Sequence, residues 1–128
     1  MVIELRQDRD LENFLERSKA DPVLIFKHST QCPVSDQAYE EFTRFLETSG
    51  DMTCGVVLVI ENRDVSNAIA ALLGVRHESP QAIVVRDGQQ KWNASHWSIT
   101  ADALTEAVRG NSEFGLRMAD FGNPLPPR

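Results

Sequence analysis

The feature that most constrains the fold is the stretch at residues 23–35, Val-Leu-Ile-Phe-Lys-His-Ser-Thr-Gln-Cys-Pro-Val-Ser. Its apolar start, Val23–Phe26, is typical of a central strand that is buried on both faces. After Pro33, apolar residues recur at helical spacing, and proline fits best in the first turn of a helix. The stretch therefore predicts a strand, a tight loop and a helix that begins at Cys32.

A cysteine at the start of a helix has a distinctive chemistry. It faces backbone N–H groups that have no partner within the helix, and it lies at the positive end of the helix dipole. Both effects favour the thiolate, which is the nucleophilic form. Three residues later, where a dithiol redox protein has its second cysteine, the chain has Ser35. We interpret Cys32 as a reactive thiol, and Ser35 as a replacement for the resolving cysteine that is not itself a nucleophile.

The rest of the chain alternates helical and strand patterns. Asp87-Gly88 is a strong hairpin signal between two strand-like runs, and Thr100 is a good cap for a final helix. Expected strands lie at 2–5, 23–27, 54–60, 81–86 and 89–94, and expected helices run from Asp8 or Asp10 to about residue 20 and over 33–49 (closed by Gly50), 65–73 and about 101–108.

This order of elements predicts an α/β thioredoxin-like fold, with a central mixed sheet of four or five strands and about four helices. The right-handed crossover rule makes strands 23–27 and 55–60 parallel neighbours. We assign residues 1–110 to this domain and residues 111–128, which end in Asn-Pro-Leu-Pro-Pro-Arg, to a tail that is partly ordered or flexible.

Composition narrows the function. The 128 residues suit one domain, and the net charge of -6 without any basic run argues against a nucleic-acid surface. No apolar run is long enough to span a bilayer, and the N-terminus lacks the core of a signal peptide, so we expect a cytoplasmic protein without a membrane partner. In that compartment two cysteines indicate one reactive and one buried thiol.

The predicted topology separates the two cysteines. The helix between them places Cys54 at the opposite end of the sheet, roughly 20–25 Å from Cys32, whereas a disulfide needs Cα atoms within about 7 Å. We therefore expect Cys54 to be a buried, inert residue. The same topology gathers His28, His77 and His96 at the Cys32 end.

Pro80 opens the strand at 81–86. In a thioredoxin-like fold, a proline at this place follows a cis bond, lies against the reactive sulfur and exposes the main chain of Ser79 to an extended ligand. The alternative is an ordinary trans proline at the start of a strand.

With these residues assembled, the sequence resembles the monothiol bacilliredoxins, thioredoxin-like proteins linked to the small thiol bacillithiol. The similarity covers about residues 15–108. Its most specific parts are Phe-Lys-His-Ser-Thr-Gln-Cys-Pro-Val-Ser at 26–35, Gly-Val-Arg-His-Glu-Ser-Pro-Gln at 74–81, and the run from Asp87-Gly88 to Ile99-Thr100. Departures from the family pattern are Gln31, which could alter client choice, Trp97 and the proline-rich tail.

The resemblance implies a function. Cys32 would attack a mixed disulfide between bacillithiol, or a similar small thiol, and a client protein, and would release the client. Another bacillithiol molecule or a partner redoxin or reductase would regenerate it, with no bound cofactor or metal. The residues expected to support the site are His28, Thr30, Gln31, Pro33, Ser35, His77, Ser79, Pro80 and His96.

Other functions remain open at this point. The cysteine of a thioredoxin-like binding or stress-response module could be regulatory and not catalytic. A peroxidase, or a metal cluster ligated by thiolates of two subunits, is a further possibility, because a single thiolate gives no closed metal site. A serine hydrolase using Ser29 or Ser35 is rejected, since the chain has no nucleophile elbow and no placed acid.

Overall fold

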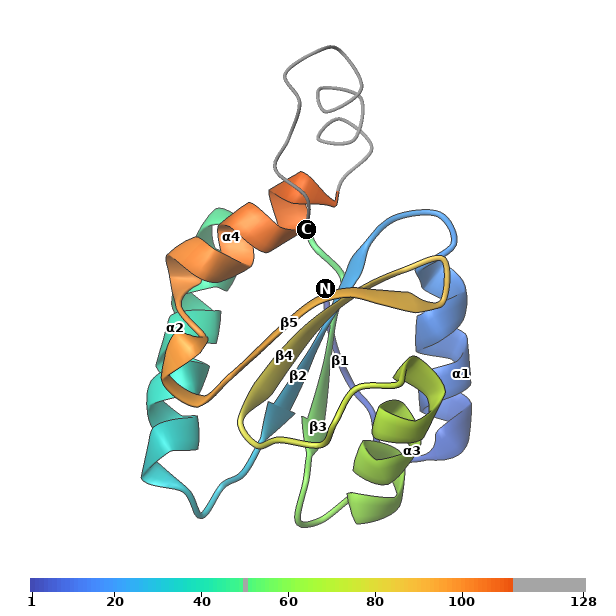
Figure 1. Ribbon diagram of the computed structural model, residues 1–128, viewed down its shortest axis with the longest axis horizontal. Coiled ribbons are helices and arrows are strands. Elements are labelled where there is room, and N and C mark those ends of the chain that lie inside the picture. Colours follow the sequence, from blue (N-terminus) through green and yellow to red (C-terminus); the bar gives the residue numbers. More distant parts are fainter. Residues whose placement is uncertain (50, 112–128) are drawn as a thin grey trace, which may run out of the picture.

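The computed structural model describes residues 1–49 and 51–111. Five strands form one sheet in the order β1-β3-β2-β4-β5, and helices cover both faces (Figure 1). The strands are β1 (Val2–Glu4), β2 (Val23–His28), β3 (Cys54–Leu58), β4 (Gln81–Arg86) and β5 (Gln89–Ser95). The helices are α1 (Asp8–Arg17), α2 (Pro33–Thr48), α3 (Arg63–Leu73) and α4 (Ala101–Gly110), and a 3-10 turn, η1 (His96–Ser98), follows β5.

Strand β2 lies at the centre of the sheet, as its continuous apolar sequence predicts. It pairs in parallel with β3 and antiparallel with β4, so both of its edges are hydrogen-bonded. In the pairing with β4, Lys27 is the Cα partner of Gln81, the residue that follows Pro80. The carboxyl end of β2 therefore meets the segment that leads into β4, and both lie at the same edge of the sheet (Figure 1).

The two faces of the sheet are covered by different helices. Helices α2 and α4 pack on one face and α1 and α3 on the other (Figure 1). Phe26 and Phe42 stack in the first layer, with ring centroids 4.8 Å apart. In the second layer, the position of Gly55 in β3 has no room for a side chain, because a Cβ there would lie 2.8 Å from Leu5 Cδ1.

The hairpin between β4 and β5 forms at Asp87-Gly88, as predicted. Both residues have positive φ, 54° and 71°, which a two-residue type I′ turn requires. Thr100 caps α4 as predicted, since its hydroxyl accepts a hydrogen bond from the Ala103 amide at 3.1 Å. The turn and the cap confirm the topology after Pro80.

The differences from the predicted elements lie at their ends. The first helix is capped by Gln7 and not by an aspartate, because the Asp10 carboxylate reaches back to accept the Gln7 amide at 3.2 Å. Strand β2 extends to His28, and β3 ends at Leu58 where the chain turns towards α3. The predicted closure of α2 at Gly50 falls outside the described residues, as does the predicted tail at residues 111–128 apart from Asn111, which is the C-cap of α4.

Candidate active site

Cys32 is the N-cap of α2, and Pro33 occupies the first helical position, as the sequence predicts. The backbone at Cys32 is extended (φ -124°), and its carbonyl accepts the first helical hydrogen bond, from the Asp36 amide at 3.1 Å. The Cys32 thiol makes no capping hydrogen bond and is partly exposed. A partly exposed thiol at a helix N-terminus is accessible to a second sulfur and lies in the field of the helix dipole.

Ser35 braces the loop that carries the cysteine. Its side chain is fully buried, and its Oγ lies 2.9 Å from the Ser29 amide and 2.7 Å from His28 Nδ1. The oxygen accepts the amide proton, so the hydroxyl proton is available for the imidazole nitrogen. Both hydrogen bonds tie the start of the loop to the first turn of α2. The Ser35 hydroxyl thus both accepts and donates within the protein.

His28 belongs to this brace. Its ring stacks on Tyr39 with centroids 4.8 Å apart, and burial lowers the pKa of His28, although the carboxylates of Asp36 and Glu61 oppose that shift. A neutral ring can accept the Ser35 proton at Nδ1, which leaves the Nε2–H tautomer. His28 therefore positions the cysteine loop through Ser35 and not through a hydrogen bond to the thiol.

Lys27 is buried on the opposite face of β2. Its side chain is fully buried, and Nζ lies 3.1 Å from both the Ser66 carbonyl in α3 and Nδ1 of His77. Burial lowers the pKa of Lys27 to about 8. Burial, followed by the positive charge of Lys27, lowers the pKa of His77. His77 is exposed, and because an ammonium can only donate, its Nδ1 is the acceptor in the contact with Lys27.

The segment before β4 contains the predicted cis bond, between Ser79 and Pro80. The Pro80 carbonyl accepts the His96 amide at 3.1 Å, and His96 Nε2 lies 3.7 Å from a Glu78 carboxylate oxygen. His96 has a positive φ of 53°, which is uncommon for a residue other than glycine. These contacts join the segment before β4 to the turn after β5.

The three histidines lie at the cysteine end of the sheet, as predicted, but they serve separate networks. His28 contacts Ser35, His77 contacts Lys27, and His96 contacts the segment before β4. Thr30 and Gln31 are exposed in the cysteine loop. The contact between the Pro80 ring and the Cys32 sulfur remains a prediction.

Three residues that contact the histidines near the site were not predicted from the sequence: Lys27, Tyr39 and Glu78. Lys27 offered a signal, because a lysine that ends a buried strand needs a hydrogen-bond partner inside the protein. Tyr39 and Glu78 offered none, since a tyrosine or a glutamate in a polar stretch is usually a surface residue.

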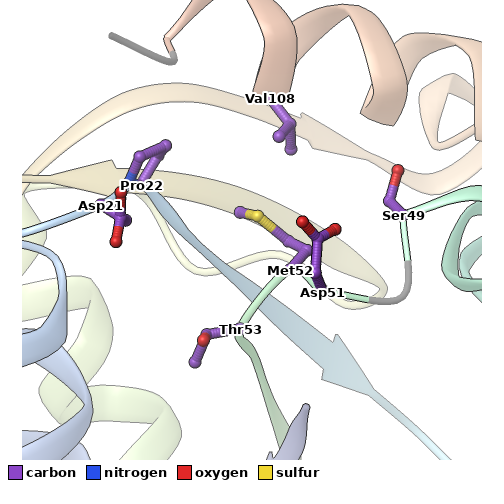
Figure 2. Close-up of a pocket in the computed structure, with 7 residues that line it drawn as sticks. All are labelled: Asp21, Pro22, Ser49, Asp51, Met52, Thr53 and Val108. Carbon is purple, nitrogen blue, oxygen red and sulfur yellow. The ribbon is translucent and has the colours of Figure 1, made fainter.

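Cys54 lies at the start of β3, at the far end of the sheet from Cys32, as predicted. It is fully buried, and burial raises the pKa of its thiol to about 12. Both cysteines are free. A cavity of about 360 Å³ lies at this far end, lined by residues that precede β2 and β3 and by Val108 of α4 (Figure 2). It is remote from the cysteine loop, and none of its lining residues belongs to the candidate site.

The geometry suits chemistry at a single sulfur. Within residues 1–49 and 51–111, no three histidine, cysteine, aspartate or glutamate side chains form a group that could hold a metal ion. Nor does any helix in these ranges have the length and apolar character needed to cross a membrane. What the site offers is one partly exposed thiol, in a loop that Ser35 and His28 brace.

Comparisons with known proteins show the family and the fold of the chain. The family model for the monothiol bacilliredoxin BrxC matches residues 3–104. The chain belongs to the monothiol bacilliredoxin family. The chain is also similar to a solved thioredoxin-fold structure with a proposed oxidoreductase activity, at 37% identity and a TM-score of 0.75, covering 83% of this chain and 92% of that one.

More distant structures share the fold alone. Thioredoxin from Fasciola hepatica is 14% identical with a TM-score of 0.70, and the match covers 86% of this chain and 99% of the thioredoxin. Thioredoxin from Schistosoma mansoni is 20% identical with a TM-score of 0.68, covering 86% and 97% of the two chains. The family and the fold together support a thiol redox function.

Proposed function

We propose that the protein removes bacillithiol, or a similar small thiol, from mixed disulfides on client proteins, with Cys32 as the nucleophile. The observation that carries this proposal is the position of Cys32, partly exposed at the N-terminus of α2 beside a fully buried Ser35. Such a site can accept a sulfur from outside but has no internal thiol to resolve the product. Family membership supports the same chemistry.

The reaction is a pair of exchanges. The Cys32 thiolate attacks the small-thiol sulfur of the mixed disulfide, that disulfide breaks, and the client leaves as a thiolate that takes a proton from solvent. Cys32 then carries the small thiol as a new mixed disulfide. The thiolate of a second small-thiol molecule then attacks the small-thiol sulfur that is bonded to Cys32. This attack frees Cys32 and forms the disulfide of two small-thiol molecules. A partner redoxin or reductase can supply the second thiol instead.

Ser35 explains why the second thiol comes from outside. A cysteine at this position could attack the adduct internally, whereas a hydroxyl is not a nucleophile towards a disulfide. The hydroxyl is also held by Ser29 and His28. The adduct therefore persists until an external thiol reaches it. No bound cofactor is needed, because both electrons come from thiols. Small-thiol pools of this kind are cytoplasmic, and we propose that location.

The client is proposed to bind along the segment before β4. The Ser79 main chain lies next to the cis bond and can pair with an extended thiol-bearing peptide, and the Pro80 ring would shield the sulfur. The exposed loop residues Thr30 and Gln31 would face the client on the other side of the thiol.

Adduct mapping tests the proposal. The reduced protein is treated with oxidised bacillithiol or oxidised glutathione, and the modified cysteine is identified by peptide mass spectrometry. We expect one adduct, on Cys32, that forms faster with the bacillithiol disulfide, and none on Cys54. Absence of any adduct while iodoacetamide still alkylates Cys32 would favour a regulatory cysteine in a binding module. A faster reaction with glutathione would overturn the choice of small thiol.

A further inference from the structure

The end of β2 carries two adjacent polar side chains that point to opposite faces of the sheet, as successive strand residues do. His28 reaches Ser35 of α2 and so holds the cysteine loop. Lys27 reaches His77 and so holds the segment before Pro80. The two loops that meet at the exchange site are thus both anchored to consecutive residues of one central strand.

The anchoring on the Lys27 side is double. Gln81, the Cα partner of Lys27 in the sheet, donates its Nε2 to the Arg76 carbonyl at 3.0 Å. Lys27 donates to the next residue, His77, at 3.1 Å. Lys27 and Gln81, which pair in the sheet, therefore bind His77 and Arg76. These are two successive residues of the segment that ends in the cis bond.

Packing alone does not account for the lysine. A buried ammonium is costly, and an apolar side chain of similar volume in its place is often neutral or stabilising. Among the described residues, its hydrogen-bond partners are the Ser66 carbonyl and the His77 ring. Within the described residues no carboxylate forms an ion pair with Lys27; the hydrogen bond to His77 fixes the segment before β4 instead.

We propose that Lys27 is a positioning residue for the exchange reaction: through His77 it fixes the segment at residues 76–80 and so aligns the Ser79 main chain with Cys32. This inference rests on the proposed function. It assigns Lys27 no contact with the substrate. It also predicts that the effect of Lys27 passes through the His77 ring, which gives the test.

The test compares Lys27→Met, His77→Leu and the double variant, with His77→Gln as the matched control. Methionine keeps the length and burial of Lys27 but cannot donate, leucine removes the acceptor, and the glutamine oxygen can still accept from Lys27. Two reactions are measured: release of a model protein from a bacillithiol mixed disulfide, and alkylation of Cys32 by iodoacetamide, a small reagent that does not need an aligned segment.

We expect Lys27→Met and His77→Leu each to slow client release about tenfold, because small misplacements of a bound group carry large rate penalties. The double variant should be no slower than His77→Leu, since that change already removes the hydrogen bond to Lys27, together with the 3.3 Å contact between His77 Nδ1 and Ser66 Oγ. His77→Gln should remain within about twofold of the wild type, and iodoacetamide should react with all variants within about twofold. Client release by Lys27→Met at the wild-type rate, an equal loss in the alkylation rate, or additive losses in the double variant would overturn the proposal.

A structural readout separates this proposal from the proposed function. The His96 amide, which donates to the Pro80 carbonyl, reports on the segment directly. Its hydrogen exchange should be faster in Lys27→Met, while amides in α2 keep their wild-type rates. Should the wild-type protein not react with the mixed disulfide, the proposed function fails, and an unchanged His96 amide would still refute the positioning role on its own.

Discussion

Replacing Ser35 by alanine should destabilise the protein far more than the loss of a hydroxyl on a helix usually does. The Ser35 oxygen is the hydrogen-bond acceptor for the buried Ser29 amide and lies 2.7 Å from His28 Nδ1. An unsatisfied buried amide costs about 1–3 kcal/mol, and the lost bond to the half-buried imidazole adds about 1 kcal/mol. We expect the free energy of unfolding to fall by about 2–4 kcal/mol.

Urea unfolding of the wild type, Ser35→Ala and Thr43→Ala measures this difference. Thr43 is the matched control, because it lies on the same helix and its hydroxyl donates to the Tyr39 carbonyl at 2.9 Å on the exposed side. Its loss should cost less than about 0.5 kcal/mol. Equal, small losses in the two variants would refute the bracing role of Ser35.

Three further predictions follow from the site and its surroundings. Ser35→Cys should form a disulfide with Cys32 once Cys32 carries a small thiol, so the adduct seen by mass spectrometry should have a shorter lifetime than in the wild type; an unchanged lifetime would contradict the geometry. Because burial lowers the pKa of Lys27 from 10.5 to about 8, the unfolded chain binds more protons between these values. The free energy of unfolding should therefore rise by about 1 kcal/mol between pH 7 and pH 9 relative to that of Lys27→Met, and parallel pH profiles for the two proteins would count against a buried ammonium. Gly55→Ala should lower the free energy of unfolding by about 1–3 kcal/mol, because the new Cβ would lie 2.8 Å from Leu5 Cδ1; denaturant unfolding at wild-type stability would show that the layer can adjust.

The order of the elements was predictable because local signals and burial agree along most of the chain. The apolar run of β2, the proline after Cys32 and the Asp87-Gly88 turn each have one good structural solution. The predicted cap of the first helix was wrong. The sequence offers Asp8 and Asp10 as caps, whereas Gln7 is the N-cap and the Asp10 carboxylate accepts its amide from within the first turn.

The position of the reactive cysteine was predictable, but the support around it was not. Helix-start chemistry places Cys32 from local sequence alone. The partners of Lys27 and His28 depend on which helix covers which face, and Ser66 and Tyr39 come from helices that the sequence does not orient around the strand. Long-range side-chain pairs of this kind are fixed by tertiary packing and have no signature in spacing.

The central claim is that Cys32 takes a small thiol from a client protein, and a single-turnover transfer tests it most directly. A model protein carrying one bacillithiol mixed disulfide is mixed with an equimolar amount of the reduced Cys54→Ala variant, and both intact masses are followed with time. We predict that the model protein loses the bacillithiol mass as the variant gains it on Cys32, and that Cys32→Ser gains none. Retention of the bacillithiol by the model protein, or transfer that persists in Cys32→Ser, would contradict the claim.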